Sequence, residues 1–182
     1  MIVSDATGMP VVLRSWQPAD WAGTSALLEG FAVLYPGFDA WLKRTLGVGD
    51  QPKARTVVAV DAEGHIVGAA IYKPKADREK LATLYVSPEY RNRGIGTALL
   101  TWIIRDWRSR GVAQGYMTHR RGRKGGIVSL ATSYGFKHIG TAIHKYGMGE
   151  HEDVYEWRDQ ADMATFDTPR VREGPVRRGQ AL

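Results

Sequence analysis

The segment LYVSPEYRNRGIGTALL, residues 84–100, joins an apolar run to a run with helical spacing. A proline ends the first run, and Gly94 and Gly96 fall at the start of the second. Glycine costs a helix about 1 kcal/mol relative to alanine, so two of them in one first turn need a reason. Unpaired N–H groups at a helix N-terminus bind phosphate, and glycine lets the phosphate approach the backbone. With Arg91 and Arg93 beside it, the segment predicts an anion-binding strand–loop–helix unit.

The composition bounds the kind of protein. The chain has 182 residues, 43% hydrophobic and 24% charged, which is typical of one globular domain. A net charge of +6 favours anionic ligands. The lack of cysteine excludes disulfides and thiolate metal sites, and we expect no metal. No apolar run approaches the roughly 20 residues that span a bilayer, and the start lacks a signal-peptide layout, so we expect a cytoplasmic protein without membrane contact.

The elements around the segment predict an α/β fold. Their order is β-α-α-β-β-β-α-β-α-β-β, which predicts a mixed sheet covered by helices. We expect strands at 11–16, 55–61, 65–72, 80–86, 113–119, 141–148 and 153–157, and helices at 18–34, 39–47, 94–110 and 125–136, the last of them ending at Gly135.

The end of the sequence differs in composition from the rest. After Trp157 the chain is polar and rich in Pro, Gly and Arg. Such a segment has too few apolar groups to offset the entropy of ordering it. We therefore expect a single domain over residues 1–157 and a basic, disordered tail over 158–182.

The segment also resembles a known family motif. Residues 84–100 match every position of L-x-V-x-P-x-x-[RQ]-x-x-G-x-[GA]-x-x-L-L, the acetyl-CoA motif of the GNAT superfamily of N-acetyltransferases. The later YGFKHIG, residues 134–140, resembles the family's G-F-x-x-x-G, and the likeness covers about residues 11–157. A dinucleotide-binding turn would need a third glycine, which does not follow at the required spacing. The resemblance implies a mostly antiparallel, twisted mixed sheet, splayed at the acetyl-CoA site.

The resemblance also implies where acetyl-CoA, the acyl donor, would bind. The backbone of the strand end would pair with the pantetheine arm, and the N–H of Val86 would polarise the thioester carbonyl. The N–H groups of the loop and the first helical turn would hold the pyrophosphate. These expected donor-binding residues are Leu84, Tyr85, Val86, Arg91, Asn92, Arg93, Gly94, Ile95, Gly96 and Thr97.

The acceptor would approach from the opposite side of the sheet. Tyr35, Phe38 and Trp41 are candidates for its wall, although aromatic residues at such spacings also form cores. The implied reaction is direct attack of a primary amine on the thioester in a ternary complex. The acceptor stays open: a small amine, a peptide or protein amine, or aminoacyl-tRNA.

The sequence departs from the family at the catalytic positions. Where many members carry Glu, Asn and Tyr, this chain has His119, Lys124 and Ala131. An amine is mostly protonated at pH 7, so a proton acceptor matters, and histidine can serve. The candidate catalytic residues are His119, Tyr134 and Tyr146.

A basic run, HRRGRKGG at residues 119–126, forms the second departure. It could contact the phosphates of CoA, RNA or only solvent, and we assign Lys124 to the donor site. The missing tyrosine keeps an alternative function open, in which a degenerate GNAT domain binds CoA or nucleic acid without acetyl transfer. The oligomeric state, a homodimer included, is also open.

Overall fold

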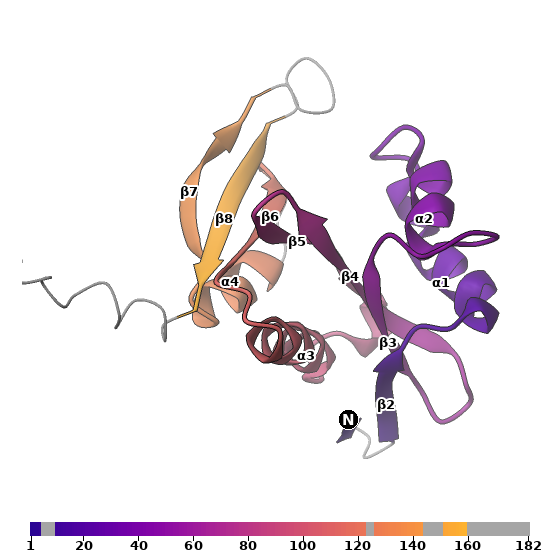
Figure 1. The fold of residues 1–182 in the computed structure, drawn as a ribbon. Coiled ribbons are helices and arrows are strands. Elements are labelled where there is room, and N and C mark those ends of the chain that lie inside the picture. Colours follow the sequence, from indigo (N-terminus) through magenta and orange to yellow (C-terminus); the bar gives the residue numbers. More distant parts are fainter. Residues whose placement is uncertain (5–9, 123–125, 144–150, 160–182) are drawn as a thin grey trace, which may run out of the picture.

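The computed structural model describes residues 1–4, 10–122, 126–143 and 151–159 (Figure 1). The strands are β1 (Ile2–Ser4), β2 (Pro10–Ser15), β3 (Arg55–Val60), β4 (Ile66–Lys75), β5 (Arg78–Val86), β6 (Gln114–Arg120), β7 (Lys137–Ala142) and β8 (Glu152–Arg158). The helices are α1 (Trp21–Leu28), α2 (Phe38–Leu46), α3 (Ile95–Ser109) and α4 (Gly126–Ser133), with 3₁₀ turns η1 (Pro18–Asp20), η2 (Glu29–Phe31) and η3 (Pro88–Tyr90). Within these ranges, no helix combines the length and apolarity needed to cross a membrane.

The strands form one eight-stranded sheet. Its order is β1-β2-β3-β4-β5-β6-β8-β7, and every neighbouring pair is antiparallel except β5 and β6, which are parallel. The predicted mixed, mostly antiparallel sheet is confirmed. The parallel pair follows from the chain path, because α3 crosses over between β5 and β6 and returns the chain to the same end of the sheet.

Helices cover both faces of the sheet. In Figure 1, α1 and α2 lie on one face and α3 and α4 on the other. Alternation along β4 builds both cores: Ala70 joins the cluster under α3, and its neighbour Ile71 joins the cluster under α2. The sheet is thus buried from two sides at its centre, where β4 reads as a nearly continuous apolar run over residues 66–72.

Glycines set the ends of the helices next to the site. Gly47 takes a left-handed conformation, φ 74°, and ends α2 as expected. Gly94 is also left-handed, φ 78°, and lies directly before α3. The first helix is shorter than predicted: α1 stops at Leu28, and a 3₁₀ turn containing Gly30 replaces its last turns. A glycine at that point lowers helix stability, and the pattern of apolar residues did not reveal it.

Two strands differ from expectation. β1 was not predicted; it extends the sheet at the N-terminal edge, where Leu13 N–H donates to the Met1 carbonyl. β7 begins at Lys137, earlier than the predicted 141–148, because Gly135, φ 88°, reverses the chain directly after α4. Residues 144–148 of that predicted strand lie outside the described ranges.

The C-terminal boundary lies close to the expected one. β8 continues through Arg158, and the Asp159 N–H donates to the Ala113 carbonyl over 3.0 Å. The described chain ends there, so the predicted tail from 160 onward lies outside the described ranges and the two-part division remains a proposal.

One glycine of the core leads to a stability prediction. A Cβ on Gly115 would clash with Cζ3 of Trp107, whose side chain is fully buried. Gly115→Ala should therefore lower the free energy of unfolding by about 1–3 kcal/mol, because the indole must shift inside a packed core. Urea denaturation measures the change. Gly30→Ala, where no atom lies within 4 Å, is the matched control; equal losses in both variants would contradict the packing argument.

Candidate active site

The parallel strands β5 and β6 separate in the middle of the sheet. They pair only at Glu79–Leu81 with Gly115–Met117. Directly afterwards the register with β4 shifts, because Ile71 pairs with Thr83 while Tyr72 pairs with Leu81. The residue of β5 between Leu81 and Thr83 is therefore an extra one without a partner position in β4, and such a bulge bends its strand. The bend leaves an opening in the sheet, bounded by the end of β5 and the end of β6.

Backbone groups of β5 point into this opening. The Ser87 N–H donates to the Val67 carbonyl on the β4 side over 2.9 Å. Since hydrogen-bonding direction alternates along a strand, the N–H groups of Leu84 and Val86 point away from β4. The Val86 carbonyl also points away from β4, because it accepts a hydrogen bond of 3.0 Å from Nε of Arg91 on that open side. The strand end therefore offers free-edge donors to an extended ligand.

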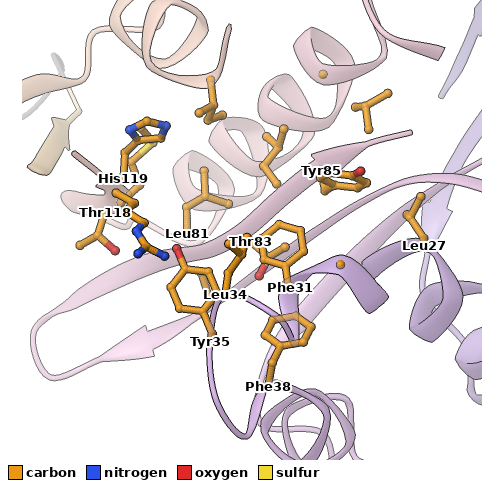
Figure 2. Close-up of a pocket in the computed structure, with 18 of the residues that line it drawn as sticks. Leu27, Phe31, Leu34, Tyr35, Phe38, Leu81, Thr83, Tyr85, Thr118 and His119 are labelled. Carbon is orange, nitrogen blue, oxygen red and sulfur yellow. The ribbon is translucent and has the colours of Figure 1, made fainter. Parts of the chain in front are cut away.

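A cavity of about 1010 Å³ runs through the opening (Figure 2). It reaches both faces of the sheet: the loop before α3 and the start of α4 on one side, and the α1–α2 connection on the other. Figure 2 shows Phe31, Leu34, Tyr35 and Phe38 lining it from that connection, opposite Thr118 and His119 of β6.

The helix start at α3 forms an anion-binding concavity. Gly94 is left-handed and Ile95 begins the right-handed helix, a pair of conformations that converges successive N–H groups. The Ala98 N–H donates to the Gly94 carbonyl, so the N–H groups before it, through Thr97, have no partner within the helix. A Cβ on Gly96 would lie 3.5 Å from Leu130 Cδ2, toward the cavity. The residues present fit a pyrophosphate.

The two arginines of the motif have different places. Arg91 lines the cavity, bonds to the Val86 carbonyl and lies 5.3 Å above the Tyr85 ring. It holds the end of β5 against the loop. The guanidinium of Arg93 lies 5.4 Å from the Tyr90 ring instead, and Arg93 does not line the cavity.

The expected aromatic wall forms on the opposite side. Phe38 and Trp41 have ring centroids 5.3 Å apart, and Tyr35 stacks at 6.2 Å on Phe31. Phe31, which falls within the helix predicted over residues 18–34, links the wall to β5 through an edge contact with Tyr85 at 5.4 Å. The Tyr85 side chain thus faces the wall, although its backbone was predicted for the donor.

The catalytic candidates are not all brought together. His119 lines the cavity, and alternation with Met117 directs it to the face covered by α3 and α4. Tyr134 does not line the cavity: its hydroxyl shares a hydrogen bond of 2.6 Å with Thr101, and its ring packs on the core. Ala131, at the family's tyrosine position, is fully buried. Tyr146 and Lys124 lie outside the described ranges.

One buried carboxylate in the cavity was missed from the sequence. Glu152, the first residue of β8, is 3% exposed and lines the cavity. It lies opposite Arg120 of β6 in the sheet register. The predicted strand began one residue later, so its alternation did not include Glu152.

The basic run splits between two environments. Arg120 lines the cavity. Arg121 turns to the β7–β8 pair, where its guanidinium lies 2.9 Å from the Asp153 carboxylate and donates to Thr141. The hydrogen bond from Arg121 lowers the pKa of Asp153 below its usual range. The hydrogen bond from Thr141 and the positive charge of Arg121 lower it further. Residues 123–125 of the run lie outside the described ranges.

Solved structures of similar fold are N-acetyltransferases. The ribosomal-protein-S18-alanine N-acetyltransferase from Escherichia coli is 18% identical, TM-score 0.63, covering 81% of this chain and 93% of that chain. Ard1 from Thermoplasma volcanium is 15% identical, TM-score 0.68, with 81% and 97% covered. The PaiA N-acetyltransferase from Thermoplasma acidophilum, solved in complex with coenzyme A, is 18% identical, TM-score 0.62, with 81% and 98% covered.

Sequence comparison gives the family. Among curated proteins, none is significantly similar to this chain. The family model of the acetyltransferase (GNAT) domain matches residues 52–147, slightly more than half of the sequence and the part that holds the bulge, the glycine loop and α4. The chain therefore belongs to the GNAT acetyltransferases, a family of acyltransferase enzymes that use acetyl-CoA.

Proposed function

We propose that the protein transfers an acetyl group from acetyl-CoA to a primary amine, by direct attack while both substrates are bound. The observation that carries the proposal is the opening between β5 and β6, whose cavity joins the glycine loop on one face to the aromatic wall on the other. Two substrates can therefore meet from opposite sides of the sheet. The cavity is at the upper end of the size of single-ligand sites, which leaves room for the donor arm and an acceptor.

The donor half uses backbone groups. The N–H groups from Gly94 to Thr97 would hold the pyrophosphate, and the strand edge at Leu84 and Val86 would pair with the pantetheine arm. When bound, acetyl-CoA supplies an activated acyl group as a thioester. The outward N–H groups of β5 would stabilise negative charge that develops on the thioester oxygen, as donors of an oxyanion hole do.

The acceptor half must remove a proton. An amine that enters the cavity as an ammonium ion cannot attack until it is deprotonated. We assign this task to His119, because its imidazole lines the cavity beside the strand opening. Glu152, the buried carboxylate, would hold the ammonium form in place before the proton leaves.

Acceptor identity can be tested directly. A panel of small amines, peptides with free N-termini, lysine-containing peptides and aminoacyl-tRNA is incubated with acetyl-CoA, and CoA release and acetylated product are both measured. Peptides come first, because the E. coli enzyme of similar fold is named for acting on a ribosomal-protein alanine. Tight CoA binding with no product from any amine would favour the degenerate alternative.

Glu152→Gln should raise KM for the amine about 10–100-fold with a smaller effect on kcat. The variant removes the charge that pairs with the ammonium while keeping the side-chain volume. Steady-state kinetics with the best amine of the panel measures the split, and thermal unfolding checks the fold. Glu156→Gln, on the same strand but outside the cavity, is the matched control. A kcat loss at unchanged KM would instead make Glu152 the proton acceptor.

A further inference from the structure

Two lysines of the cavity lie directly opposite each other. Lys73 of β4 and Lys80 of β5 are partners in the antiparallel register, and both line the cavity. The Nζ of Lys80 lies 5.9 Å from the centre of the Tyr116 ring of β6. Both cations therefore lie on the wall of the cavity, where they would attract a ligand that carries negative charge.

The environment of Lys73 strengthens this point. Its Nζ lies 5.2 Å from the centre of the Trp41 ring in the aromatic wall. Burial lowers the pKa of Lys73, and the charges of Lys75 and Arg44 lower it further. Among the ion pairs that join described residues, none includes Lys73. The wall of the cavity thus holds a partly desolvated cation whose surroundings are positive.

The lysines and the reacting end of the cavity are well separated. Lys80 lies beside Tyr116 of β6 in register, whereas Glu152 lies beside Arg120, four residues farther along the same strand. Four residues of strand span about 13 Å. Leu84, whose N–H points into the opening, is displaced from Lys80 in the same direction along β5. The cavity therefore holds the lysine pair at one point along the strands and Glu152, with Arg120 opposite it, about 13 Å farther along.

We propose that Lys73 and Lys80 bind an anionic group of the acceptor, so that the enzyme acts on amines that carry a carboxylate or phosphate several bonds from the amino group. The inference rests on the proposed function. The aromatic wall would pack on the apolar spacer between the two charged ends, since Phe38 and Trp41 of α2 line the cavity. The lysine pair would also discriminate against acceptors with a positive charge at that end.

The test uses matched amines that differ in one charge. The probes are 6-aminohexanoate against 6-aminohexanamide, 6-aminohexyl phosphate against 6-aminohexanol, and the C-terminally amidated peptides Ser-Ala-Glu and Ser-Ala-Gln. Binding is measured by calorimetry with the full chain saturated with coenzyme A, and acetylation is measured separately with acetyl-CoA. The first two pairs separate carboxylate from phosphate, and the third separates a peptide from a free small molecule.

We expect the anionic member of at least one pair to bind about 10–100-fold more tightly, as for hydrogen bonds to charged groups. The double variant Lys73→Gln, Lys80→Gln should lose this preference. The double variant Lys73→Arg, Lys80→Arg keeps both charges and should keep the preference. So should Lys137→Gln, which removes one positive charge from exposed β7.

Equal binding within every pair by the wild-type protein, or a preference that survives the double glutamine variant, would overturn the inference. The two proposals fail separately. Amines that are acetylated without any preference for anions would remove only the lysine assignment. Anion-selective binding without acetylation would support the lysine site and contradict the proposed reaction.

Discussion

Gly96→Val should weaken binding of acetyl-CoA at least about 100-fold while leaving the fold intact. A Cβ at this position meets Leu130 at 3.5 Å and Val86 at 3.9 Å, which is ordinary contact, so the first carbon is accommodated. The two methyl groups of valine would extend beyond it into the cavity between β5 and α4. They would keep a pyrophosphate away from the N–H groups of the helix start, and losing two hydrogen bonds to a charged group has this magnitude.

Gly96→Ala is the matched variant. It adds only the tolerated carbon and replaces glycine in a helix, so thermal stability should stay the same or rise. Calorimetric titration with acetyl-CoA and thermal unfolding of both variants give the comparison. A valine variant that binds acetyl-CoA like the wild type would show that the donor lies elsewhere.

His119→Gln should lower kcat/KM for the amine by about 10²–10⁴ with donor affinity unchanged. Glutamine can keep a hydrogen bond but cannot accept the amine proton. Steady-state kinetics with the best amine of the panel and calorimetric titration with acetyl-CoA measure the two quantities.

His138→Gln is the control, because His138 lies on β7 near Asp153 and does not line the cavity. The two cavity groups can also be told apart: we expect His119→Gln to act on kcat and Glu152→Gln on KM. A His119 variant with the wild-type rate would leave water and backbone as the route for the proton.

The segment 84–100 by itself indicated the family and the strand–loop–helix unit, and it carries the predicted donor site. Its rules are local: a proline ends a strand, glycines at a helix start let a phosphate approach the backbone, and apolar residues recur at helical spacing. The structure starts α3 at Ile95, one residue after the predicted start at Gly94. The lengths of the other helices were less certain, as α1 shows, because a single glycine shifted the boundary.

Only the tertiary structure decided how the two faces of the site meet. The bulge in β5 that opens the sheet appears as a register shift against β4, and register depends on contacts between residues far apart in sequence. For the same reason the sequence could not show that Lys73 faces Lys80, nor that Glu152 enters the cavity. It also offered Tyr134 as an acid, whereas packing on α3 commits its hydroxyl to Thr101. The local motif indicated the family, and long-range pairing of the strands shaped the opening in the sheet and the cavity that runs through it.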